Sequence, residues 1–187
     1  MKAGVRALGV AESYRDDEST LAGAVVRASR VVDGFVFGRC TVGGTDATDA
    51  VVSMVDRLDR ADVRYLLLAG IAPAWFNLFD LHDIHERVDR PVLSVSFEES
   101  PGLEPALCEA FSGDALDDRL AVYRCQPDRH RVTVDDGAVF VRAVGLDSGT
   151  AADVVRGFTP EGGRPEPLRV ARLVARAADE AVNRLPA

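Results

Sequence analysis

The sequence predicts an α/β protein built on one mixed β-sheet, and two features of the chain lead to this class. Three strand-like segments follow one another near the N-terminus with short connections, which indicates an antiparallel meander. After a helical segment, Tyr65–Ala69 is apolar throughout, as strands in the middle of a sheet are. The helical segment before this strand leads it back parallel to the first strand, an arrangement that the right-handed crossover rule favours. A length of 187 residues suits one well-cored domain, so we expect residues 1–187 to form a single domain.

The N-terminal strands are predicted where apolar residues dominate between turn residues, at Val5–Val10, Leu21–Ala28 and Val31–Cys40. Gly43 and Gly44 then interrupt the chain. A helix is predicted from Ala47, because apolar residues recur from there at helical spacing while Asp and Arg residues occupy the other face.

The rest of the chain alternates between helical and strand-like patterns. Downstream of the central strand we predict a helix over Phe76–Val88, a strand over Pro91–Phe97, one or two helices over Leu103–Val122, a hairpin of His130–Thr133 and Val139–Val144 that turns at residues 135–137, and helices over Thr150–Phe158 and Leu168–Leu185.

The composition excludes several classes of protein. No apolar run approaches the length of a membrane span, and no apolar region follows the N-terminus as in a secretory signal, so we expect a cytoplasmic protein. The three cysteines form no Cys-x-x-Cys pair, which argues against a zinc ribbon and a disulfide framework. For so small a chain a homodimer is a reasonable expectation.

The charge pattern indicates an organism that lives at high salt. The net charge is −8, and Lys2 is the only lysine among 22 basic residues. Carboxylates bind hydrated cations well, whereas lysine stems expose apolar surface, so we expect a haloarchaeal source. At molar salt the Debye length is about 3 Å, and the acidic net charge therefore does not exclude a nucleic-acid partner.

Four segments resemble motifs of one known family: Gly9–Glu12, Thr41–Thr48, Ala69–Asn77 and Arg164–Ala171. The last, Arg-Pro-Glu-Pro-Leu-Arg-Val-Ala, is unusual enough in composition to be a specific signal. Together they make the chain resemble, from Arg6 to Ala178, the archaeal endonuclease dU family, which is related to endonuclease V. The resemblance implies a ribonuclease-H-like mixed sheet flanked by helices. It also implies a DNA-repair endonuclease that acts at deoxyuridine in DNA with Mg²⁺ or Mn²⁺, because such sheets hold a metal-activated water at the strand ends.

The resemblance also places a metal-binding carboxylate at Ala11 and another at Ala69, and alanine cannot coordinate a cation. The remaining candidate catalytic residues are Glu12, Asp46 and Asp80, of which Glu12 and Asp46 are candidate metal ligands. Each has a structural alternative. Glu12 points to the opposite sheet face from Ala11 in a regular strand, Asp46 is placed to cap a helix, and Asp80 suits a solvated helix face.

Candidate substrate-binding residues lie in two segments. The first segment is expected to form a base pocket, in which aromatic faces hold a base taken out of its stack. Its candidate residues are Gly70, Trp75, Phe76 and Asn77. Glu166, Arg169 and Arg172, together with Arg164 and Arg176, belong to a C-terminal arginine stripe that suits phosphate contacts. Core packing for Phe76, backbone hydrogen bonds for Asn77 and ion pairs for the arginines are the structural alternatives.

Two functions therefore compete. The first is an endonuclease whose metal site has been rebuilt around the surviving carboxylates. The second is a pseudoenzyme, a catalytically inactive descendant that binds nucleic acid or a protein partner.

Overall fold

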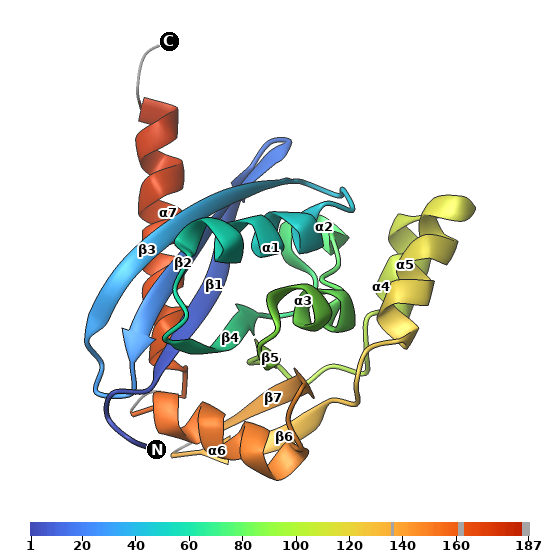
Figure 1. The fold of residues 1–187 in the computed structure, drawn as a ribbon. Helices are drawn as coiled ribbons and strands as arrows, with labels where there is room; N and C mark the ends of the chain where they lie inside the picture. Colours follow the sequence, from blue (N-terminus) through green and yellow to red (C-terminus); the bar gives the residue numbers. More distant parts are fainter. Residues whose placement is uncertain (136, 161–162, 185–187) are drawn as a thin grey trace.

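The computed structural model describes residues 1–135, 137–160 and 163–184, and it contains one seven-stranded mixed sheet in the order β3-β2-β1-β4-β5-β7-β6 (Figure 1). The predicted mixed sheet flanked by helices is therefore confirmed. None of the helices within these ranges is both long enough and apolar enough to cross a membrane.

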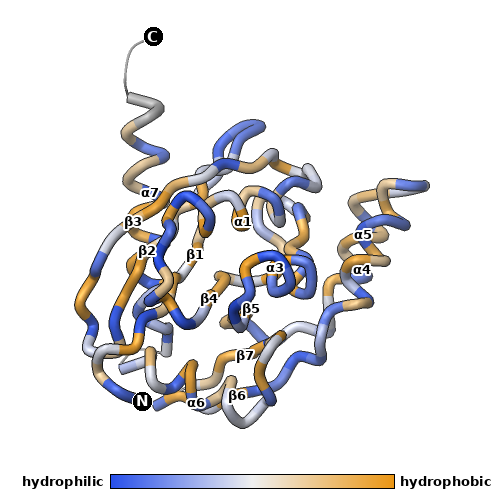
Figure 2. Tube along the Cα trace, viewed as in Figure 1, coloured by the Kyte–Doolittle hydropathy of each residue, from blue (hydrophilic) through white to orange (hydrophobic). Residues whose placement is uncertain are grey.

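The first two strands of the meander are longer than the sequence pattern predicts. Strands β1 (Arg6–Arg15), β2 (Glu18–Arg27) and β3 (Val32–Thr41) pair in antiparallel order. The β1–β2 turn is hydrophilic and exposed, because polar residues extend the two strands past the apolar core (Figure 2).

The parallel part of the sheet follows from two crossovers. Helix α1 (Ala47–Leu58) leads into β4 (Val63–Ala69), which pairs in parallel with β1, and α3 (Leu81–Val88) leads into β5 (Val92–Ser96), which pairs in parallel with β4. The carboxyl end of β4 therefore lies beside the second half of β1, and that of β5 lies on the other side of β4. This edge of the sheet is where α/β folds place their sites.

Helices cover both sheet faces and divide the core into two layers. On one face α1 and α3 pack on alternate residues of β1, β2 and β4. On the other face lie α6 (Ser148–Phe158) and α7 (Glu166–Arg184), and α7 runs along β1 and β2. The predicted end of the last helix, Leu185, falls outside the described residues.

The remaining elements are two helices, α4 (Glu104–Ala110) and α5 (Asp114–Arg124), and the predicted hairpin of β6 (His130–Val134) and β7 (Gly137–Val144). Residue 136 in the hairpin turn is outside the described ranges. Strand β7 pairs in antiparallel order with β5, which extends the sheet.

The helix predicted over Phe76–Val88 is wrong at its start. The predicted first residue, Phe76, instead ends the four-residue segment α2 (Pro73–Phe76), in which Ala74, Trp75 and Phe76 all have positive φ angles of 46°, 54° and 64°. Residues 77–80 are not helical, and α3 begins at Leu81. The helical spacing of apolar residues does not reveal a left-handed turn, because residues other than glycine rarely adopt positive φ angles.

Candidate functional site at the ends of the central strands

Ala11 and Ala69 lie together on the face that α7 covers. Val10 pairs with Leu68 across β1 and β4, and the next residue of each strand joins one small apolar cluster with Ala171 of α7. Ala11 is 4% exposed. The two positions that the resemblance assigns to metal ligands are thus neighbours, and they present methyl groups.

Glu12 extends from the opposite face, as the alternation of a regular strand requires. Its Oε2 accepts hydrogen bonds from Ser19 Oγ and from the Ala74 backbone N–H, both at 2.8 Å. Burial raises the pKa of Glu12, although these two donors and the charge of Arg172 act in the opposite direction. Glu12 thus holds the left-handed turn against the sheet.

Asp46 precedes α1, but its carboxylate does not cap this helix. It accepts hydrogen bonds from the Thr41 N–H, from Thr41 Oγ1 and from Asn77 Nδ2. Burial acts to raise the pKa of Asp46, but these donors outweigh it and the pKa lies below its usual value. The carboxylate therefore stays ionised, and its oxygens are used within the fold.

Asn77 is fully buried and caps α1 in place of Asp46. Its Oδ1 accepts the Ala47 N–H at 2.9 Å, and its Nδ2 donates to the Thr41 carbonyl at 2.8 Å and to Asp46 Oδ1 at 2.6 Å. The backbone-bonding alternative thus describes this residue, since no group of its amide is left to read a base. No local pattern predicts that an asparagine 30 residues downstream caps this helix.

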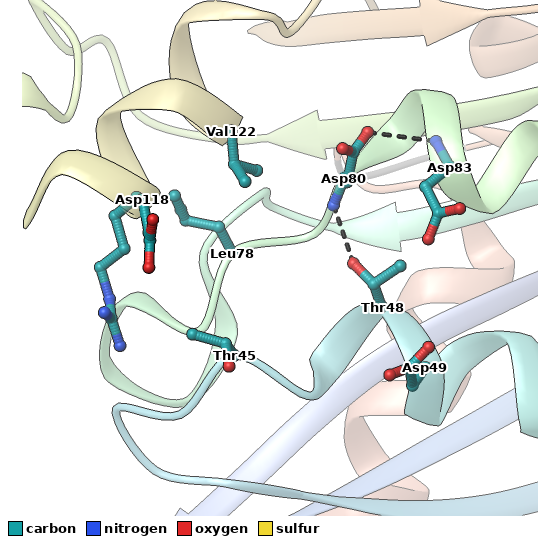
Figure 3. Close-up of a pocket in the computed structure, with 9 residues that line it drawn as sticks. Thr45, Thr48, Asp49, Leu78, Asp80, Asp83, Asp118 and Val122 are labelled. Carbon is teal, nitrogen blue, oxygen red and sulfur yellow. Dashed lines mark hydrogen bonds between the residues drawn. The ribbon is translucent and has the colours of Figure 1, made fainter. Parts of the chain in front are cut away.

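Asp80 caps α3 and lines a separate pocket of about 310 Å³ (Figure 3). Its Oδ1 accepts the N–H groups of His82 and Asp83, and its own N–H donates to Thr48 Oγ1. The pocket also receives the carboxylates of Asp49, Asp83 and Asp118. Arg87 pairs with the first two of these at 2.7 and 3.0 Å.

The carboxylates that the sequence offered do not fit a divalent metal. Glu12, Asp46 and Asp80 each accept at least two hydrogen bonds from nearby backbone or side-chain donors. Across the described part of the chain, no group of three or more His, Cys, Asp or Glu side chains is placed to hold an ion. Mg²⁺ needs oxygen ligands in near-octahedral geometry, and Ala11 and Ala69 supply none.

The aromatic turn keeps an open face. Trp75 is 50% exposed, and its ring lies 5.9 Å from that of Phe76 and 5.2 Å from that of Phe111. Arg119, which no sequence motif marks, stacks 4.0 Å over Phe111. It donates hydrogen bonds to the Phe76 carbonyl and to the carbonyls of Gly43 and Gly44. Phe76 belongs to the packing, whereas Trp75 offers a surface for stacking.

Gly70 opens into a second pocket of about 290 Å³ beyond the ends of β4 and β5. Its φ of 84° suits glycine, and no atom lies within 4 Å of where a Cβ would stand. Polar groups from distant segments line this pocket, and the sequence pattern did not point to them: Ser94, Ser96, Glu98, Tyr123, Arg129 and Arg142. Ser94 Oγ makes no hydrogen bond within the described residues, so it is free to bind a ligand.

The C-terminal arginine stripe divides into two groups. Glu166 and Arg169 form a bidentate ion pair at 2.6 and 2.7 Å, and Arg30 adds a further positive charge beside Glu166. Arg172, by contrast, acts electrostatically on Glu12. The ion-pair alternative thus describes Arg169, whereas Arg172 follows Ala171, which packs in the cluster of Ala11 and Ala69.

Comparison with known proteins gives a consistent result. The family model described as "Endonuclease dU" matches residues 3–179. A UPF0215 protein of Thermococcus kodakarensis is 33% identical over 165 residues, which cover 87% of this chain and 83% of the relative. The crystal structure of a protein of unknown function from Archaeoglobus fulgidus has a TM-score of 0.84 at 28% identity and covers 92% of this chain and 97% of its own.

Endonuclease V is a more distant structural neighbour. The enzyme of Ciona intestinalis, crystallised with a DNA 24mer containing an inosine followed by a ribo-adenosine, has a TM-score of 0.63 at 12% identity and covers 95% of this chain and 87% of its own. At this identity the likeness concerns the fold, which is of the ribonuclease-H-like type.

Proposed function

Because the chain belongs to the endonuclease dU family, we propose that it binds nucleic acid at the carboxyl ends of its central strands and recognises deoxyuridine in DNA there, without cutting the strand. One observation carries this choice. The edge of the sheet keeps an open pocket at Gly70 and an exposed Trp75, while the two adjoining positions that would bind a metal are Ala11 and Ala69.

The Gly70 pocket has the chemistry to hold an unpaired pyrimidine. Its volume of about 290 Å³ is close to the lower end of ordinary ligand sites, roughly 300 Å³. The hydroxyl of Ser94 and the guanidinium of Arg142 supply donors for the carbonyl oxygens of uracil, and Phe140 supplies an apolar wall. A structural neighbour binds DNA that contains an inosine, which supports nucleic acid as the partner.

Trp75 supplies the second contact. A half-exposed indole on a rigid turn offers its face to a neighbouring base, and base–aromatic stacking contributes about 1–3 kcal/mol per base. Three consecutive residues with positive φ, tied down by Glu12 and Arg119, set the direction of this ring.

The competing proposal is an active endonuclease that uses Mg²⁺ or Mn²⁺ at Glu12, Asp46 and Asp80. It would require these carboxylates to release the donors that they now bind and to move together. We therefore derive no catalytic step for this chain.

The test measures binding and cleavage together. Fluorescently labelled single-stranded DNA with one deoxyuridine, or with thymidine in its place, is titrated in molar KCl with Mn²⁺ and with EDTA, and the products are run on a denaturing gel. We expect equal binding in both buffers, preference for deoxyuridine, intact DNA, and about 5- to 150-fold weaker binding by Trp75→Ala. Metal-dependent cutting that is lost in Glu12→Gln or Asp46→Asn would establish the endonuclease instead, and failure to bind either DNA would refute the proposal.

The composition supports three further proposals. A haloarchaeal source and a cytoplasmic location fit the acidic, lysine-poor chain, and the assays accordingly use molar KCl. A homodimer is proposed from the small size of the chain, and sedimentation velocity in the same buffer tests it.

A further inference from the structure

Three arginines belong to two segments that pack near the carboxyl ends of β4 and β5. Ala171 and Ala175 of α7 are completely buried against the sheet, and the residue that follows each of them, Arg172 and Arg176, is exposed. These two lie one helical turn apart on the same side of α7. Arg164, in the loop before α7, stacks 3.9 Å over the ring of Phe97, which follows β5.

The positive charges of Arg172 and Arg176 act on Arg164. Burial lowers the pKa of Arg164, and the positive charges of Arg172 and Arg176 lower it further, while Glu98 acts in the opposite direction. Arg172 also acts on Glu12, at the end of the apolar part of β1. Ala171, the residue before Arg172, packs in the cluster that contains Ala11 and Ala69, and Phe97, on which Arg164 stacks, follows β5. The two segments that carry these arginines therefore lie beside the carboxyl ends of β4 and β5.

Their charge is poorly compensated. Neither Arg172 nor Arg176 forms a hydrogen bond or an ion pair of 4 Å or less with any other described residue, whereas Arg169 on the same helix is paired with Glu166. In a chain of net charge −8 such a concentration of unpaired arginine is unexpected. Guanidinium groups bind phosphate through parallel N–H donors, and a phosphate between them would relieve their mutual repulsion.

We propose that Arg164, Arg172 and Arg176 form a phosphate-binding site beside the alanine pair, so that guanidinium groups hold the phosphate there in place of a metal ion. The inference rests on the proposed function in that the phosphate belongs to the backbone of the bound single strand. The methyl groups of Ala11 and Ala69 favour this site, because carboxylates at these positions would repel the phosphate.

The test is the salt dependence of binding in EDTA. Affinity for the deoxyuridine strand is measured by fluorescence anisotropy between 0.5 and 2 M KCl, a range of about fourfold chosen to resolve the counterion slope. Each phosphate contact on a single strand contributes about 0.7 to the slope of log affinity against log salt. The double variant Arg172→Gln/Arg176→Gln, in which this phosphate loses both partners on α7, should lower the slope by about 0.7, and each single variant should lower it by less.

Arg131→Gln is the matched control, because Arg131 is exposed on the edge strand β6 at the far end of the sheet. It should leave the slope unchanged, and circular dichroism checks that every variant is folded. Preference for deoxyuridine over thymidine should survive in the arginine variants, because phosphate contacts carry no sequence information. An unchanged slope in the double variant would overturn the inference and leave the proposed function intact.

Calorimetry separates the source of the phosphate. Inorganic phosphate and deoxyuridine monophosphate are titrated into the wild type and the double variant. If the wild type binds no strand but binds the mononucleotide, and the double variant does not, the phosphate site stands and the proposed nucleic-acid function fails. If the wild type binds neither strand, mononucleotide nor inorganic phosphate, both are refuted.

Discussion

Replacing Asn77 by alanine should destabilise the fold, because this side chain joins three segments that are distant in sequence. The substitution removes the cap on the Ala47 N–H, the donor to the Thr41 carbonyl and the donor to Asp46. A buried polar group left without a partner costs about 1–3 kcal/mol. Ala47 is completely buried and incurs this cost in full, whereas water reaches Thr41 and Asp46. The expected loss is therefore about 3 kcal/mol, a large share of a typical stability of about 5–15 kcal/mol.

Urea unfolding in molar KCl, followed by far-UV circular dichroism, measures this loss. Ser53→Ala is the control. Ser53 is exposed on α1, the helix that Asn77 caps, and its side chain makes no hydrogen bond within the described residues. It should change the free energy of unfolding by less than about 0.5 kcal/mol. If Asn77→Ala kept its stability to within about 1 kcal/mol and instead lost the preference for deoxyuridine, the capping role would be refuted and Asn77 would be a base-reading residue.

Three other perturbations test the site. The pKa of Glu12 is raised in the fold, so the folded state keeps a proton that the unfolded chain has released, and the free energy of unfolding falls as pH rises from the ordinary value of 4.5 through the folded pKa. Glu12→Gln should lose this decline, so urea unfolding should show that its stability relative to the wild type increases between pH 4 and pH 7. Gly43 has a φ of 68°, and Gly43→Ala would place a Cβ 2.9 Å from the ring of Trp75, the only tryptophan. This variant should lose about 1–2 kcal/mol of stability and shift the tryptophan fluorescence. Gly4→Ala, whose Cβ would have no atom within 4 Å, should do neither. Ala11→Asp combined with Ala69→Asp should create a Mn²⁺ site that calorimetry detects, and heat equal to that of the wild type would contradict the assignment of these positions.

The order of the elements was predictable because it depends on local patterns. Tyr65–Ala69 is apolar on both faces, which only a central strand requires, and the recurrence of apolar residues from Ala47 fixed α1. The pairing of β7 with β5 was not predictable, because no local pattern specifies which strands meet across 50 residues. Predicted strands end several residues too early where polar side chains continue the hydrogen-bonded ladder beyond the core, as in β1.

The candidate site was predictable in position and much less so in detail. Glu12 faces away from Ala11, as strand alternation required, but its bond to the backbone of Ala74 depends on a left-handed turn that apolar spacing cannot reveal. Arg169 and Arg172 look alike in sequence, and what separates them is a glutamate three residues before the former. Residues such as Arg142 enter the Gly70 pocket through strand pairing, so only the assembled sheet shows them.

The pair Ala11 and Ala69 also changes how the fold depends on its surroundings. Carboxylates that share a metal site repel each other until a cation arrives, so a protein that carries them is more stable when the ion is supplied. Two methyl groups in one apolar cluster have no such requirement, and they bury apolar surface under all ionic conditions. The central strands of this protein should therefore melt at the same temperature whether divalent cations are abundant or removed by a chelator, which makes this edge of the sheet independent of the cell's supply of free magnesium.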